Sequence, residues 1–449
     1  MTDHLHDAHA DRLLRNRLTR RDTLWLFAAG TSAAALQGCA VSPVSGERIM
    51  VGLSEEQERQ VDTQQAPYQF SQDLGTVQDA EVNTYLGRVN QSLLGQVHRR
   101  DMPYSVRALN ANYVNAYTFP GGAIGVTRGI LVELQDESEL AALLGHELGH
   151  VNARHAAQRQ GQALVAQVAM VSLAVAAQDS AWAPLIGLGS QIGASALLAN
   201  YSRDNERQAD ALGQEYLVGT GYPATGMTQL HALLVSQHKE QPGMLETMFA
   251  SHPMSTERMA TAREAAATRY AASAKAPRQR ERYMDSIAGL RRIRPAIEAC
   301  KNGELAMGRK ALPEAQGQFA QALKVAPRDY AANLRMAQCL QAQGQPRDAQ
   351  RYADSARSIY PQEAQAHKLG ASLHLALRNP GAAFNALEQF DRVLPGDPSV
   401  LFMKAYALDG MGQGRRAAEH YAQFLQINRQ GDAAQFSVNR LRAMGYAIQ

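Results

Sequence analysis

Apolar residues recur at the spacing of an α-helix between residues 137 and 158. The positions that share one face are Leu140, Leu143, Leu144, Leu148 and Val151. Because residues three and four apart lie on one side of a helix, the pattern predicts a single helix from Glu137 to Gln158. Ser138 or Asp136 is the expected cap of its first turn. Two glycines inside the segment lower its helix propensity by about 1 kcal/mol each, which suggests that something packs closely against it.

From about residue 296 the chain changes to a pattern that repeats every 34 residues. Pro327, Pro361 and Pro395 are each 34 residues apart, and Arg429 takes the next position. Small and aromatic residues recur at fixed offsets before these positions: Ala315, Phe319 and Ala322; Ala349, Ala353 and Ala356; Ala383, Leu387 and Phe390; Ala417, Tyr421 and Phe424. The pattern resembles the tetratricopeptide repeat, a pair of helices whose second member ends at the proline. We expect four copies stacked into an all-α solenoid, the first degenerate in its opening helix.

The first forty residues resemble an export signal. Five arginines lie between residues 12 and 21, and 13 largely apolar residues follow at 24–36, too few to span a bilayer. The run ends in LQGC at 36–39, which resembles the lipobox of bacterial lipoproteins. The resemblance implies that Cys39 is lipidated, and Ala40 after it favours the outer membrane. A plain cleaved signal and a short uncleaved anchor are alternatives, and Arg20–Arg21 leaves a twin-arginine export route open.

Composition limits the number of domains and the kinds of partner that the chain can have. The 449 residues suffice for two or three domains, and 45% of them are hydrophobic. A net charge of +3 without a block of like charge gives no reason to expect a nucleic-acid partner. The three cysteines form no CxxC pair, which argues against a cysteine metal site. Cys300 and Cys339 are expected to be buried thiols, with a disulfide as the alternative in an oxidising compartment.

The predicted helix carries the sequence LGHELGHVNARH at residues 144–155. His146 and His150 are four residues apart, so both imidazoles project from one face and can bind one metal ion. Glu147 lies beside His146, where it can act as a general base on water at the metal. Because H-E-x-x-H is the spacing of zinc peptidases, we expect one Zn2+ per chain.

The third metal ligand stays open on spacing alone. His155 comes one residue short of the metzincin spacing, so we expect its ring to point away from the pair, as a surface or structural histidine. Residues 200–217 form a second predicted helix, with Glu206 and Asp210 on one face. Glu206 could complete the site, and Asp210 could accept a hydrogen bond from the outer nitrogen of a ligand histidine. An ordinary solvated helix with charged pairs is the alternative.

Three segments together resemble the M48 peptidase family: HELGHVNARH at 146–155, SRDNERQAD at 202–210 and NAYTFPGGAIGVTRGIL at 115–131. The resemblance implies that Glu206 is the third ligand and that Asp210 is the aspartate of the family motif. It also implies a strand and glycine turn ahead of the metal helix. Apolar residues alternate at 123–126, so we expect an edge strand there that pairs with an extended substrate. The residues expected to bind substrate are Pro120, Gly121, Gly122, Ala123 and Ile124; a plain hairpin is the alternative.

A further segment, SHPMSTERM at 251–259, is also similar to one in this family. The similarity implies that His252 and Arg258 face the metal. His252 would stabilise the oxyanion or fill the open coordination position at rest, and a structural histidine is the alternative. Apolar segments at 163–178 and 182–198 are expected to cover the site, to rest on a membrane or to form a buried helical hairpin.

These features predict an α+β fold: a mainly helical, zincin-type domain with a small β-sheet, followed by an all-α repeat solenoid. The expected domains are a signal peptide with lipobox at 1–39, an M48 metallopeptidase domain at 40–275, a linker helix at 276–295 and the repeats at 296–449. The resemblance implies an exported zinc endopeptidase, a lipoprotein on the periplasmic side of the outer membrane, that degrades misfolded or stalled outer-membrane proteins. The repeats would bind substrates or assembly machinery. A chaperone or scaffold with a shut peptidase site is the alternative, and an amidase is disfavoured by the strand segment.

Overall fold

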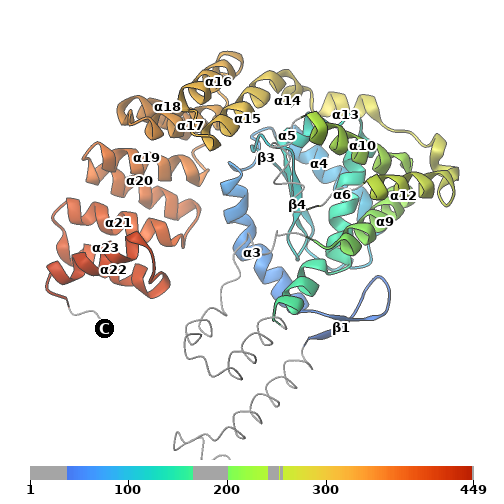
Figure 1. Cartoon of the computed structure of the whole chain (residues 1–449), viewed down its shortest axis with the longest axis horizontal. Coiled ribbons are helices and arrows are strands. Elements are labelled where there is room, and N and C mark those ends of the chain that lie inside the picture. Colours follow the sequence, from blue (N-terminus) through green and yellow to red (C-terminus); the bar gives the residue numbers. More distant parts are fainter. Residues whose placement is uncertain (1–37, 165–200, 241–251, 253–255, 447–449) are drawn as a thin grey trace, which may run out of the picture.

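The computed structural model describes residues 38–164, 201–240, 252 and 256–446, with side chains at 237–240 left aside (Figure 1). The expected signal peptide and most of the expected cover over the site lie outside these residues. Helices surround a small sheet in the N-terminal part, and an arc of paired helices forms the C-terminal part (Figure 1). No helix in the described part of the chain has the length and apolar character needed to cross a bilayer.

The N-terminal part begins with a hairpin and two helices. Strands β1 (Cys39–Val41) and β2 (Arg48–Met50) pair antiparallel. Helix α3 (Glu55–Gln72) starts at a capping box formed by Ser54 and Gln57, and α4 (Ala80–Leu93) starts at Asp79. Helix α4 packs its apolar face into the main core of the N-terminal part, hereafter the peptidase part after the family that its sequence resembles.

The three-stranded sheet has the order β3-β5-β4, which corrects one prediction. Strand β5 (Ala123–Thr127) pairs parallel with β3 (Ser105–Leu109) and antiparallel with β4 (Ala116–Thr118). The expectation of an edge strand at 123–126 is therefore wrong, because β5 is central and buried along its whole length. Its alternating apolar residues pack on both faces of the sheet, a pattern that periodicity alone does not separate from an edge strand. Strands β3 and β4 are the two edges of this sheet.

The main core lies between the sheet and a group of helices. These are α5 (Arg128–Leu131), α6 (Glu137–Asn152), α9 (Arg203–Gly219), α10 (Thr225–Glu240) and α12 (Thr256–Ala267). Asp136 caps α6 by accepting from the Glu139 N–H, as expected. The predicted helix does not continue to Gln158: α6 ends at Asn152, and Arg154 adopts a left-handed conformation with φ 59°. Residues 155–164 then resume as a separate helical segment.

Helices α6 and α9 approach each other at backbone contact. A Cβ atom added to Gly149 would lie 2.8 Å from the carbonyl oxygen of Ala209, and one added to Gly145 would lie 3.0 Å from that of Gly213. The close packing predicted from these glycines is confirmed. Small residues on both helices thus allow α9 to present its own polar residues to the histidines of α6.

Residues 276–295 differ from the predicted linker helix. They hold two short helices, α13 (Arg280–Ser286) and α14 (Ala288–Arg292), preceded by the 3-10 helix η3 (Ala271–Lys275). Tyr283, Ile287 and Leu290 are buried in the main core of the peptidase part. The segment therefore belongs to that core, because its apolar residues fill space beside α4 and α6.

The C-terminal part is the expected solenoid. Its helix pairs are α15 (Arg294–Gly308) and α16 (Leu312–Val325), α17 (Tyr330–Ala342) and α18 (Pro346–Ile359), α19 (Ala364–Ala376) and α20 (Pro380–Val393), and α21 (Pro398–Gly410) and α22 (Gly414–Ile427). A ninth helix, α23 (Asp432–Ala443), packs on the last pair. The small and aromatic residues of the repeat pattern are all buried, and the prolines lie just beyond each second helix, as predicted. Cys300 and Cys339 are free and buried.

Buried polar contacts join the two parts. Arg128 of α5 is 1% exposed, and its guanidinium makes two hydrogen bonds to Asp329 at 2.5 and 3.0 Å. The hydroxyl of Ser71, at the end of α3, donates to Glu363 at the start of α19. Figure 1 shows α3 lying between the sheet and the arc of the repeats. The inner side of the middle repeats is therefore occupied by the chain's own peptidase part.

Candidate metal centre

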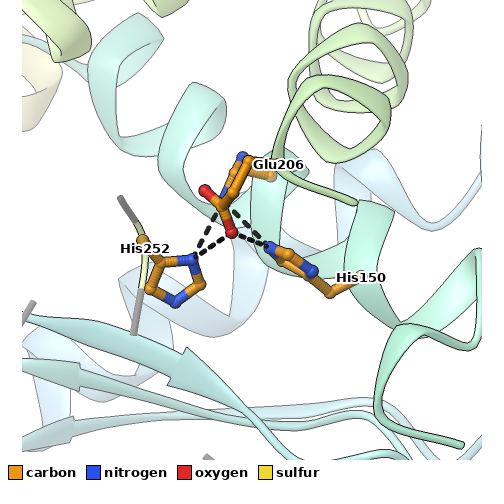
Figure 2. Close-up of side chains that lie close together, drawn as sticks. His150, Glu206 and His252 are labelled. Atoms are coloured by element: carbon orange, nitrogen blue, oxygen red, sulfur yellow. Dashed lines mark hydrogen bonds and ion pairs between the residues drawn. The ribbon is translucent and has the colours of Figure 1, made fainter. Parts of the chain in front are cut away.

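The site is built by α6 and α9 from opposite sides. His146 and His150 project from one face of α6, one turn apart, and Glu206 comes from the first turn of α9. Figure 2 shows the carboxylate of Glu206 directed at the rings of His150 and His252. These four residues form one buried group whose ligand atoms all lie within 4.8 Å of one another.

The separations within this group match the edges of a metal coordination shell. The two Nε2 atoms of His146 and His150 are 3.1 Å apart, and Glu206 oxygens lie 3.5 Å and 3.2 Å from them. A tetrahedron with metal–ligand bonds of about 2.0–2.1 Å has edges of about 3.3–3.4 Å. The three side chains therefore have the spacing that a tetrahedral ion requires.

The outer nitrogens of both histidines are engaged, which directs their inner lone pairs to the centre. His146 Nδ1 lies 2.9 Å from Asp210 Oδ1, an oxygen that can only accept. His150 Nδ1 lies 2.9 Å from His155 Nδ1, and His155 Nε2 lies 2.9 Å from the side-chain oxygen of Gln208. Since that oxygen accepts the His155 Nε2–H, His155 Nδ1 accepts from His150. In the neutral form of each ring, the inner nitrogen therefore presents a lone pair toward Glu206, an arrangement that suits a bound cation.

His155 does not lie where it was predicted. We expected its ring to point away from the histidine pair, on the surface or in a structural role. The ring is instead fully buried against His150, so the expected direction and the surface position are both wrong. A continuous helix would have carried residue 155 round to another side. The left-handed turn at Arg154 folds the chain back instead, and Glu58 and the Leu53 carbonyl hold the Arg154 side chain.

Electrostatics at the centre also favour a cation. Burial would raise the pKa of Glu206, but the imidazoles of His252 and His146 hold it well below its usual value. Burial likewise opposes ionisation of Asp210, and His231 and Arg258 hold its pKa well below the usual range. Burial would lower the pKa of His146, yet Glu206 and Asp210 together raise it to about 10. The carboxylates of Glu206 and Asp210 thus both stay ionised at the site and attract positive charge.

Glu147 lies next to this group with one of its two carboxylate oxygens unsatisfied. Its side chain is 1% exposed, and its Oε2 atom has no hydrogen-bond partner among the described residues. Its Oε1 atom lies 3.8 Å from His252 Nε2. Burial raises the pKa of the Glu147 carboxyl, which makes it a better proton acceptor than a solvated glutamate.

His252 and Arg258 both reach the centre, as the resemblance implied. His252 Nδ1 lies 3.0 Å from Glu206 Oε1 and 3.3 Å from His146 Nε2, so it stands where a fourth ligand would. Arg258 bridges the two carboxylates of α9: its Nη1 atom is 2.6 Å from Glu206, and its Nε and Nη2 atoms donate to Asp210. Arg258 therefore orients Glu206 and Asp210 together.

The Pro120–Ile124 segment does not offer free backbone to a substrate. The Gly121 and Ala123 N–H groups both donate to the buried carboxylate of Asp62, and the Gly122 N–H donates to the Phe119 carbonyl. Residues 123 and 124 pair with neighbours in the sheet. The prediction of strand pairing at these five residues is wrong, because it needed β5 to be an edge strand.

Several residues of the site were missed from the sequence. Tyr201 stacks on the His150 ring with 4.0 Å between centroids, and His231 from α10 lies 3.2 Å from Asp210. Asp62 holds the glycine turn from α3. None of these follows a spacing rule, since each comes from a different element.

Comparisons with known proteins match two segments of the chain to known families. Residues 80–266 match the Peptidase family M48, and residues 306–373 match the Tetratricopeptide repeat family. The chain thus carries an M48 peptidase domain followed by C-terminal tetratricopeptide repeats.

The matched regions span different shares of the relatives' full lengths. A Beta-barrel assembly-enhancing protease of Yersinia pestis is 27% identical over 198 residues, 42% of this chain and 40% of that protein. Metalloprotease YcaL of Escherichia coli is 27% identical over 256 residues, 53% of this chain and 95% of that protein. The chain therefore spans less than half of the barrel-assembly relative but nearly all of YcaL. Among solved structures, the MamA protein is 18% identical with a TM-score of 0.31, covering 34% of this chain and 83% of MamA.

Proposed function

We propose that the chain is an exported zinc-dependent endopeptidase that degrades misfolded or stalled proteins of the bacterial outer membrane. The observation that carries the proposal is the convergence of His146, His150 and Glu206 at 3.1–3.5 Å beside the buried Glu147 carboxylate, whose Oε2 has no hydrogen-bond partner among the described residues. Two imidazoles and one carboxylate are the ligand set of catalytic zinc in several peptidases.

His146, His150 and Glu206 would hold the ion. A zinc ion held there would supply a Lewis acid for the scissile carbonyl and for the attacking water. Glu147 takes the proton of the attacking water and passes it to the leaving amine. Asp210 and His155 keep the ligand nitrogens oriented, and Arg258 keeps Glu206 in place.

The substrate backbone would pair with β4 rather than with β5. Strand β4 is one of the two edges of its sheet, and it is the edge strand that packs on α6, which carries the histidines. An extended chain added to a sheet edge gains backbone hydrogen bonds without regard to side chains. Such pairing suits an enzyme that acts on many unfolded polypeptides.

The location and partners follow from the N-terminus and the relatives. A lipid on Cys39 would hold the protein at the periplasmic face of the outer membrane. The relatives named for barrel assembly support outer-membrane β-barrel proteins and their assembly machinery as partners. Because α5 contacts the solenoid at Asp329 and α3 contacts it at Glu363 and Pro395, such partners would bind the last helices, α22 and α23.

A second candidate is a scaffold or chaperone whose peptidase site is shut at rest. The position of His252, 3.0 Å from Glu206 and 3.3 Å from His146, favours it because the ring fills the place a water needs. His252→Ala separates the two roles: turnover rises if the ring blocks the site and falls if the ring stabilises the oxyanion.

The test of the proposed activity is degradation of casein and of an unfolded β-barrel protein, with zinc measured on the same samples. Glu147→Gln is expected to keep zinc and to lose at least about a hundredfold in turnover. Glu215→Gln, an exposed position on α9, is the matched control and should behave as wild type. If wild type and Glu147→Gln both bind zinc and cut equally well, the assignment of Glu147 is wrong. If the wild type binds no zinc, the metal site is wrong.

A further inference from the structure

The β1–β2 hairpin has an outward face of unusual composition. Cys39 lies opposite Met50 and Val41 lies opposite Arg48, so these four side chains share one face. All four are exposed, Val41 by 63% and Met50 by 49%. The outward face of a two-stranded hairpin is normally polar, and this one has two large apolar residues, one cation and no carboxylate.

The opposite face of the hairpin fixes it to the peptidase domain. Ala40 and Ile49 are half-buried against Val51, Leu53 and Ala157. The Gly52 N–H donates to the Ala157 carbonyl at 2.7 Å, and a Cβ on Gly52 would lie 2.6 Å from the backbone of Gln160. The hairpin is therefore a rigid part of the domain, attached to the helical segment that follows the metal helix.

We propose that this hairpin face lies on the membrane surface, with Val41 and Met50 inserted at the boundary between headgroups and acyl chains. Apolar side chains beside a cation are the composition that interfacial segments use on anionic lipid. Arg48 would contact lipid phosphates, since guanidinium pairs well with phosphate oxygens. The hairpin would then act as a second membrane contact beside the lipid on Cys39.

The position of Cys39 supports a bilayer as the occupant. Cys39 is the first residue of β1, so acyl chains on its sulfur would leave from the same face as Val41 and Met50. An anchor with no intervening tether brings that face to the bilayer. The peptidase site would then be held close to the membrane, because the hairpin packs on residues 157–161, just past His150 and His155. The inference rests on the proposed function only for the lipid on Cys39.

Flotation with vesicles of phosphatidylethanolamine and phosphatidylglycerol tests the hairpin separately from the lipid. The full mature chain carrying Cys39→Ser is compared with the same chain carrying Val41→Asp and Met50→Asp in addition. The aspartates are expected to lower the vesicle-bound fraction by about tenfold, the change that corresponds to the loss of a modest apolar contact. Val325→Asp with Ile427→Asp, exposed by 48% and 51% on the solenoid, is the matched control and should leave binding unchanged.

The outcomes separate this inference from the lipoprotein proposal. Equal binding of the Cys39→Ser chain with and without the two aspartates, or no binding of either, overturns the inference. Mass spectrometry of the chain recovered from bacterial cells reports acylation of Cys39 independently. If Cys39 carries no lipid but the aspartates still abolish vesicle binding, the hairpin inference stands and the lipoprotein proposal fails.

Discussion

Gly149→Ala tests whether the backbone contact between α6 and α9 holds the metal site together. The added Cβ would lie 2.8 Å from the Ala209 carbonyl oxygen and 3.0 Å from its Cα, both backbone atoms that no side-chain rotation can move. Ordinary contact begins at 3.4 Å, so α9 must withdraw by roughly 0.6 Å, the difference between 3.4 and 2.8 Å. Overpacking of this kind costs about 1–3 kcal/mol, against a gain of about 1 kcal/mol in helix propensity. The free energy of unfolding should fall by up to about 2 kcal/mol.

The larger effect is expected on metal binding. Glu206 lies one turn before Ala209, and His150 directly follows Gly149, so withdrawal of α9 separates two ligands. Metal sites tolerate deviations of about 0.2 Å in bond length, and a shift three times larger should lower zinc affinity at least about tenfold. Competition with a chromogenic chelator measures the affinity, and urea denaturation measures the stability.

Gly87→Ala is the matched control for this experiment. Gly87 lies in the middle of α4, and a Cβ there meets nothing within 4 Å. It should stabilise the protein by about 0.5–1 kcal/mol and leave zinc affinity unchanged. If Gly149→Ala is as stable as Gly87→Ala and binds zinc as the wild type does, the close approach of the helices does not determine the site.

Three further predictions concern residues around the site and between the domains. His155→Phe removes the acceptor for the His150 Nδ1–H and should lower zinc affinity about 10–100-fold in the same chelator assay. An unchanged affinity would show that His155 does not orient His150. Burial raises the pKa of Asp62 to about 7, while the backbone N–H groups it accepts oppose the rise. Because this value lies above the ordinary carboxyl pKa of about 4, the folded state binds the proton more tightly, so the unfolding free energy should fall as pH rises from about 4 to about 7. Glu139, whose pKa burial also raises to about 7, contributes a slope of the same sign. Asp62→Asn should therefore make the fall less steep in urea titrations, and an identical slope in both proteins would contradict the assignment. Arg128→Ala leaves Asp329 buried without its charge partner and should lower the unfolding free energy by about 3–5 kcal/mol. The control Arg351→Ala removes an exposed ion pair and should lower it by at most about 1 kcal/mol. Equal losses of stability in calorimetry would mean that the contact between the domains does not depend on the buried pair.

Features with a local cause could be predicted from the sequence. The two metal-ligand histidines lie on one helix, and their shared face follows from helix geometry alone. The repeats are predictable for a similar reason, since each 34-residue unit forms its own helix pair and only meets its neighbours. The small residues at 145 and 149 even indicated a close helix contact, although not which helix makes it.

The predictions that were wrong share a different cause, because they depended on contacts between distant parts of the chain. The break at Arg154 depends on Glu58 and the Leu53 carbonyl, which lie about a hundred residues away in the sequence. It decides where His155 points, and no periodicity within the metal helix contains that information. Likewise, the residues of β5 alternate as an edge strand would, but pairing with β3 makes the strand central.

The sequence by itself determined the helices, the repeat period, the pair of histidines and the glutamate beside them, because each depends on residues within a few turns of one another. Spacing left two choices for Glu206 and Asp210, metal site or solvated helix, and a family resemblance was needed to favour one. Only the tertiary structure decided which groups surround the centre: α9 against α6, His155 behind His150, Arg258 across two carboxylates and Asp62 under the glycine turn. These contacts join segments far apart in the chain, and burial gives them their strength, since charge and hydrogen bonding act most strongly where water is excluded.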